Sequence, residues 1–264
     1  MTLDAWAAAQ PRLLGMLAPL DDFGRRLESI ALGRPEPGSR CEIDGAGGFE
    51  GATYAAQNVS MGLDHLRTWR WLLECGRTPQ FAHMTLMRAA FEGAATALWL
   101  LGPDASAERV RRAAILGLED IRNRRTFEAQ VEARAQADAA AHGETRPPYD
   151  WGRARSGSQR YDDRRLAMTA AGIEKTDIPT YTTLMDDWGP GAHVFQLTSA
   201  FAHRHEWAMA FAEEVARVED TGMPGSGAIQ LRPSASWALK ITDSSMTELE
   251  AALEALEAHL RTEA

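Results

Sequence analysis

Apolar residues recur every three or four positions along most of this 264-residue chain. That spacing places them on one face of a helix and predicts an all-α fold. We expect a single-domain helical bundle over residues 1–264. It would contain about five long helices, at residues 49–76, 78–102, 104–140, 192–219 and 244–262. Shorter helices are expected at residues 3–17 with a break at Pro11, and at 21–32, 161–171 and 178–187.

The stretch 78–102 is the centre of the predicted bundle because it is apolar nearly all round. Thr78 can cap the start of a helix, and Gly102 followed by Pro103 marks its end. Small residues line one face and allow another helix to approach closely: Ala90, Gly93, Ala94 and Ala97. The opposite face carries the pair Arg88 and Glu92 where apolar residues are expected.

Three segments depart from the long-helix pattern. Residues 33–48 and 142–160 are rich in glycine or proline and predict long loops. Apolar residues alternate on both sides of Arg232, Pro233 and Ser234, which predicts a small β-hairpin at residues 228–241.

The last predicted helix, residues 244–262, carries an apolar stripe that we call the C-terminal seam. Its members follow a 3-4-3-4 spacing: Met246, Leu249, Leu253, Leu256 and Leu260. Such a stripe packs against another helix, either in the same chain or in a second copy. A homodimer through this helix is therefore one expectation.

Composition narrows the classes of protein and of partner. The chain has 45% hydrophobic residues, and Arg88 and Glu92 interrupt its longest apolar stretch, so we expect a soluble cytoplasmic protein with no membrane partner. The net charge of −9 makes nucleic acid an unfavourable partner. Two cysteines are too few for a disulfide framework. No nucleotide-binding loop or Glu-x-x-His motif occurs, so neither a cofactor nor a metal is expected.

The charged pair on helix 78–102 gives the first candidate site residues. Two interpretations stay open: a buried ion pair that fixes helix packing, or a site in which Arg88 holds an anion and Glu92 acts as a base. His203 follows Ser199 by four residues, so their side chains share a helical face. Glu92 and His203 are the catalytic candidates. The candidate ligand-binding residues are Arg88, Trp99, His65, Ser199, Asp120 and Trp207.

A mononuclear metal site built from His65, Glu92, Asp120 and His203 is a conceivable alternative, although the spacing of these residues follows no metal-binding motif.

Residues 83–112 contain Leu-Met-Arg, Phe-Glu, Trp-Leu-Leu-x-Pro and Glu-Arg-Val-x-Arg, and Ser199 and His203 follow later in the chain. This combination resembles all-helical proteins of actinobacteria that are distantly similar to the HEPN group of helical nucleases. The resemblance implies a bundle that cleaves RNA, often as a dimer, in toxin or phage-defence systems. The HEPN signature is an Arg and a His separated by four to six residues, which Arg77 and His83 satisfy.

Three functional hypotheses follow. The first is an aromatic-lined internal pocket for a small, largely apolar molecule, in a binding protein or an enzyme of specialised metabolism. It rests on eight tryptophans and on the polar residues of the central helix. The alternatives are a HEPN-like ribonuclease or phage-defence effector, and a helical protein of oligomerisation or interaction.

Overall fold

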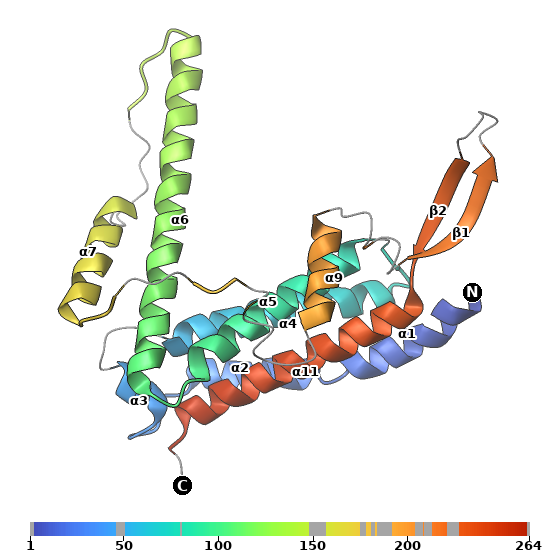
Figure 1. Ribbon diagram of the computed structural model, residues 1–264, viewed down its shortest axis with the longest axis horizontal. Helices are drawn as coiled ribbons and strands as arrows, with labels where there is room; N and C mark the ends of the chain where they lie inside the picture. Colours follow the sequence, from blue (N-terminus) through green and yellow to red (C-terminus); the bar gives the residue numbers. More distant parts are fainter. Residues whose placement is uncertain are drawn as a thin grey trace. The chain divides into compact units, whose positions relative to one another are not determined.

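The computed structural model describes most of the chain. The described residues are 3–45, 51–79, 81–147, 157–174, 178–180, 183, 192–203, 208, 213–220 and 227–262. The helices are α1 Leu3–Leu17, α2 Leu20–Leu32, α3 Arg40–Gly45, α4 Gly51–Glu74, α5 Ala82–Leu101, α6 Ser106–Ala141, α7 Gly157–Ala170, α9 Ala192–Ala202 and α11 Ala235–Leu260 (Figure 1). Helices dominate the described chain, which confirms the all-α class, although the expected set of about five long helices is not supported.

Two strands form a small antiparallel sheet, β1 (Glu213–Asp220) and β2 (Gly227–Pro233) (Figure 1). Their register pairs Val215 with Leu231 and Asp220 with Gly227, and a bulge follows Val215. The predicted helix at residues 192–219 is therefore wrong over residues 213–219, which belong to β1, whereas most of residues 204–212 lie outside the described residues. Val215 and Val218 are β-branched, which favours a strand over a helix.

The hairpin predicted at residues 228–241 is also wrong. Its expected second strand forms the beginning of α11, whose preceding residue is Ser234. Ala238, Ile241 and Thr242 are all buried in this helix. Positions three and four residues apart lie on one face of a helix, which these three residues share. The same segment also alternates apolar and other residues, and that alternation had indicated a strand.

Two helices begin or continue where the sequence predicted otherwise. α1 runs through Pro11 without ending there. Leu13 and Leu17 are fully buried on the far side of this proline, and their packing offsets the lost backbone hydrogen bond. α5 begins at Ala82 instead of Thr78, and the main-chain oxygen of Pro79 accepts a hydrogen bond from the His83 ring.

Both predicted loops contain helix. α3 lies within residues 33–48, and Ser39 supports it because its hydroxyl accepts a hydrogen bond from the main-chain N–H of Glu42. α7 begins at Gly157, inside the predicted loop 142–160. The helix predicted at residues 178–187 falls mostly outside the described residues.

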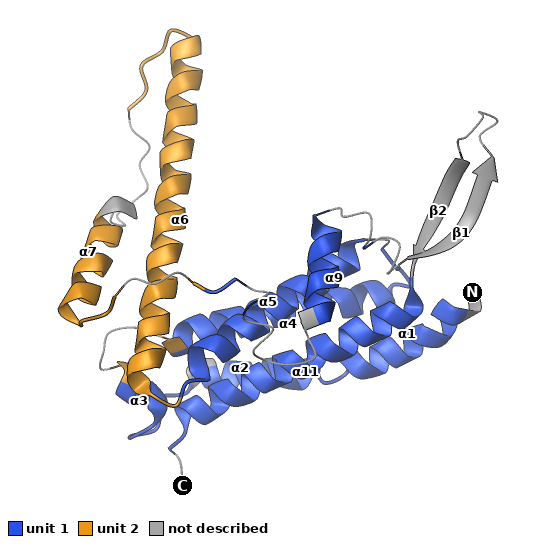
Figure 2. Cartoon of the chain, in the orientation of Figure 1, with its two compact units in different colours: residues 1–43, 52–103, 179–264 blue, residues 44–51, 104–178 orange. Residues whose placement is uncertain are grey.

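Contacts within the chain divide it into two compact units, coloured in Figure 2. Unit 1 comprises residues 1–43, 52–103 and 179–264, and unit 2 comprises residues 44–51 and 104–178. The single domain expected over residues 1–264 stays a prediction.

Unit 1 is built around α5. This helix packs against α11 and α9, and α11 also contacts α1 and α2. Trp69 of α4 donates a hydrogen bond from its indole Nε1 to the Thr242 hydroxyl of α11 at 3.2 Å. The largest fully buried side chains of this core include Trp69, Phe91, Met84, Met87, Ile241 and Leu249.

The C-terminal seam is buried inside this core. Leu249, Leu253 and Leu256 are at most 1% exposed, because α11 packs against α5, α1 and α2 of the same chain. The seam therefore finds its partner helices within one chain. The expected homodimer through this helix loses its support, because these side chains have no free surface to offer a second copy.

Unit 2 pairs α6 with α7. The Arg109 guanidinium forms two hydrogen bonds with the Asp44 carboxylate, at 2.7 and 3.0 Å, and both side chains are less than 10% exposed. The guanidinium of Arg125 lies 5.7 Å from the ring centroid of Tyr161, which joins the two helices by a cation–π contact.

Across the described residues, every helix falls short of the length and apolarity that crossing a membrane requires.

Candidate functional site

Arg88 and Glu92 lie one turn apart on α5 and form an ion pair. The Arg88 Nε donates to Glu92 Oε1 at 2.8 Å, and the two side chains are 22% and 25% exposed. The pair is thus neither deeply buried nor freely solvated. A half-buried pair costs less desolvation than one in the core, and its charged groups remain within reach of a ligand.

α9 brings two further side chains to this pair, in agreement with its place beside α5 in Figure 1. The Nη1 atom of Arg88 lies 3.5 Å from Nε2 of His203, the residue that directly follows α9. The Arg88 guanidinium also lies 5.8 Å from the ring centroid of Phe195. We call Arg88, Glu92, Phe195 and His203 the α5–α9 site.

The chemistry of the Arg88–His203 contact follows from what each group can do. A guanidinium has only donors, so a hydrogen bond between the two groups requires His203 Nε2 to accept, which needs the tautomer with its proton on Nδ1. In that tautomer Nε2 is a base. The site therefore combines a fixed cation, a carboxylate that orients it and an exposed imidazole, the groups needed to bind an anion and exchange a proton with it.

Three other candidates lie in unit 1 without a described contact to Arg88. Ser199 is half-buried on α9, and its main-chain oxygen accepts a hydrogen bond from the N–H of His203 at 3.1 Å. Trp99 is buried on α5, about 10 Å along the helix from Glu92 at 1.5 Å per residue. His65 is half-buried on α4.

Two candidates do not join this site. Asp120 is exposed on α6 and belongs to unit 2. Trp207 lies outside the described residues. Among the side chains that are described, the structure finds no group of three or more His, Cys, Asp or Glu residues placed to hold a metal ion.

Arg77 and His83 do not form an exposed pair. His83 is fully buried and stacks on Trp69, with ring centroids 5.4 Å apart, whereas Arg77 is exposed. Burial lowers the pKa of His83 to about 4, although the hydrogen bond to Pro79 acts in the opposite direction. A neutral buried ring cannot contact a phosphate in a groove, so the spacing of these two residues does not create a nuclease site here.

The aromatic side chains on α9 and at the start of α5 were not among the candidates drawn from the sequence. Phe195 lies under Arg88, and Phe201 lies 6.3 Å from Phe81 between ring centroids. Phe195, Ser199 and His203 follow one another at intervals of four residues, which places them on one helical face. That spacing was a usable signal for Phe195.

Three hollows of the described structure lie elsewhere. One lies along α2 and α11, one along α6, and one between α6 and α7. An aromatic-lined internal pocket at the α5–α9 site stays a prediction. Comparisons with models of protein families, with curated proteins and with solved structures found no match to this chain.

Proposed function

We propose that the α5–α9 site binds the anionic group of a small molecule and that His203 exchanges a proton with that molecule. The observation that supports this proposal is the contact between Arg88 and His203, with Glu92 holding the arginine. This refines the idea of a largely apolar ligand, because such a molecule would carry a carboxylate or phosphate beside an apolar body.

The ion pair leaves donors for such a ligand. Nε of Arg88 donates to Glu92 and Nη1 lies 3.5 Å from His203 Nε2, so an anion would use the remaining N–H groups of the two terminal nitrogens. An anion can receive two parallel hydrogen bonds from a guanidinium. Because Glu92 already restrains the side chain, less conformational entropy is lost when the anion binds.

Aromatic rings on α9 and at the start of α5 supply apolar surface for the proposed ligand. Phe195 packs under the guanidinium and is buried, whereas Phe81 is 44% exposed beside Phe201. An exposed phenyl group of this size favours contact with an apolar surface. A ligand with an anionic end at Arg88 and a hydrophobic body toward these rings would satisfy both parts.

Native mass spectrometry of the purified full-length chain tests the proposal. We expect a co-purifying molecule that dissociates from Arg88→Gln but stays bound to Arg70→Gln. Arg70 is a matched control because its side chain is 21% exposed and pairs with Asp21 in the same unit. The same ligand occupancy in both variants, or no adduct in the wild-type chain, would count against the proposal.

A second candidate function is metal-independent cleavage of RNA. The specific observation that favours it is again the Arg88–His203 pair, because an imidazole can take the proton of a ribose hydroxyl while a guanidinium stabilises the negative charge on the phosphoryl oxygens. The resemblance to HEPN proteins implies the same activity. In this candidate function, Arg88 and His203 would cleave RNA in place of Arg77 and His83.

RNA cleavage in the presence of EDTA distinguishes the two functions. Ribonuclease activity predicts cleavage that His203→Ala abolishes and His65→Ala retains, since His65 has no described contact with Arg88. Intact RNA after incubation with the wild-type chain would exclude this candidate and leave the small-molecule proposal standing.

A further inference from the structure

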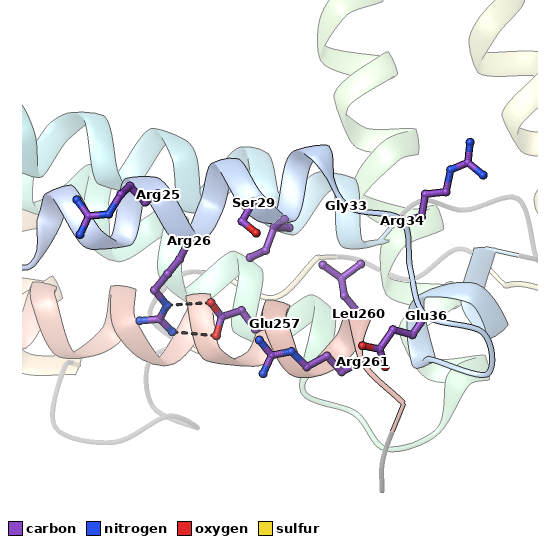
Figure 3. Close-up of a pocket in the computed structure, with 10 residues that line it drawn as sticks. Arg25, Arg26, Ser29, Gly33, Arg34, Glu36, Glu257, Leu260 and Arg261 are labelled. Atoms are coloured by element: carbon purple, nitrogen blue, oxygen red, sulfur yellow. Dashed lines mark hydrogen bonds and ion pairs between the residues drawn. The ribbon is translucent and has the colours of Figure 1, made fainter.

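A hollow of about 390 Å³ lies between α2, the segment that follows it and the end of α11 (Figure 3). Its walls carry four arginines and two glutamates: Arg25, Arg26, Arg34, Arg261, Glu36 and Glu257. Positive charge therefore exceeds negative charge here, in a chain whose net charge is −9. A hollow of this volume has the size of a site for a small molecule.

Both glutamates of the hollow already have partners. Arg26 donates two hydrogen bonds to the Glu257 carboxylate, at 2.8 and 3.1 Å, and this guanidinium holds the pKa of Glu257 below its usual range. Glu36 accepts a hydrogen bond from the main-chain N–H of Thr262 at 2.8 Å. These contacts tie the segment after α2 to the end of α11 and give the hollow fixed walls.

The other three arginines keep donors for a ligand. Arg25 pairs with Asp22, but the side chains are 69% and 54% exposed, and such a pair contributes little. Among the described residues, neither Arg34 nor Arg261 has a carboxylate within salt-bridge distance. Figure 3 shows Arg25 and Arg34 toward opposite ends of the hollow, with Arg261 on the α11 wall between them.

We propose that this hollow binds a small phosphorylated molecule through Arg34 and Arg261. A guanidinium presents paired donors that match the oxygens of a phosphate. Ser29 supplies a hydroxyl donor, and Ile30 and Leu260 supply apolar wall for the rest of the molecule. The proposal concerns residues other than those of the α5–α9 site, so it does not depend on the function proposed there.

Calorimetric titration of the full chain with inorganic pyrophosphate tests this site. We expect saturable binding with a Kd below about 1 mM, weakening as salt rises because the contacts are ionic. Arg34→Gln and Arg261→Gln should each weaken binding by about tenfold, the effect of losing one charge-assisted contact. Arg12→Gln is the matched control, since Arg12 is exposed on α1 outside the hollow, and its affinity should equal that of the wild type.

Two results would overturn the proposal. One is a wild-type chain that shows no saturable binding up to about 10 mM pyrophosphate. The other is equal weakening in Arg12→Gln, which would indicate a diffuse charge effect. Arg34 and Arg261 are exposed, so both variants should keep the fold, and their melting temperatures verify this. If the wild-type chain binds no pyrophosphate and either variant melts at a lower temperature than the wild type, the proposal is wrong and these arginines stabilise helix ends instead.

Discussion

The main-chain oxygen of Asn58 in α4 lies within clashing distance of a Cβ atom added to Gly93 of α5. The carbonyl carbon of Asn58 would lie only 3.3 Å from such an atom. Gly62 of α4 faces Ala90 of α5 in a similarly close approach. The two helices therefore touch through their backbones, which only small residues at these positions permit.

Gly93→Ala should lower the free energy of unfolding by about 1–3 kcal/mol, because one helix backbone must move away from the other. Urea denaturation measures this change. Gly15→Ala is the matched control, since Gly15 also lies in a helix and an added Cβ would meet nothing within 4 Å. That control should gain up to about 1 kcal/mol from the higher helix propensity of alanine. Equal effects at the two positions would contradict the close approach of α4 and α5.

Asp44→Asn should destabilise the chain by about 3–5 kcal/mol, because it leaves the buried Arg109 guanidinium without its counter-charge. Asp44 also accepts a hydrogen bond from the Ser106 hydroxyl at 2.5 Å, so the substitution disturbs two partners. Asp22→Asn breaks an exposed pair and should change stability by less than about 1 kcal/mol. Chemical denaturation measures the free energy of unfolding of both variants. Similar losses in the two would contradict a larger contribution from the buried pair.

Acid should weaken the fold through His83. Its pKa is about 4 in the folded chain, against an ordinary value of 6.5. Between these two pH values the histidine binds a proton in the unfolded chain but stays unprotonated in the folded chain. The free energy of unfolding therefore falls as pH decreases from 6.5 toward 4, by about 3 kcal/mol over the whole window.

Denaturation of the wild type and of His83→Phe at pH 7 and pH 4.5 tests this. The phenyl ring can keep the stack on Trp69 but cannot titrate, so the variant should lose less stability on acidification. An equal acid loss in both proteins would assign the effect to other groups.

Thr242→Val should cost about 1–3 kcal/mol, because it leaves the buried indole N–H of Trp69 without an acceptor. Valine keeps the volume of threonine, so the change isolates the hydroxyl. Thr126→Val on the exposed surface of α6 is the control, since its hydroxyl donates a hydrogen bond to the main-chain oxygen of Arg122 within the same helix. Thermal unfolding separates the two, and the prediction fails if both variants melt at the same temperature.

Helical periodicity predicted the elements whose apolar stripe is long and uninterrupted. α4 and α6 match their expected ranges closely, because Leu63, Leu66 and Leu73 in one and Ala114 and Leu118 in the other recur at helical spacing. Short-range signals failed where packing outweighed them. Pro11 stays inside α1, and the alternation around Trp237 belongs to the first turns of α11.

The candidate site was predicted only within one helix. Arg88 and Glu92 stand out on an apolar stretch, and their spacing alone indicates the ion pair. The contact between Arg88 and His203 joins residues 115 positions apart, and it depends on how α9 packs on α5. Sequence spacing contains no information on such a tertiary contact, which is why Arg77 and His83 satisfied a spacing rule without meeting in space.

Unit 1 takes its helices from both ends of the chain, and α11 contacts α1, α2 and α5. During synthesis, the partners of α11 leave the ribosome long before α11 itself is made. Their apolar faces, including Leu17, Leu20 and Met87, therefore stay uncovered until α11 has been made and packs on them. A chain whose synthesis stops before Ala235 would therefore lack α11, and the faces of α1, α2 and α5 that α11 covers would stay exposed to solvent.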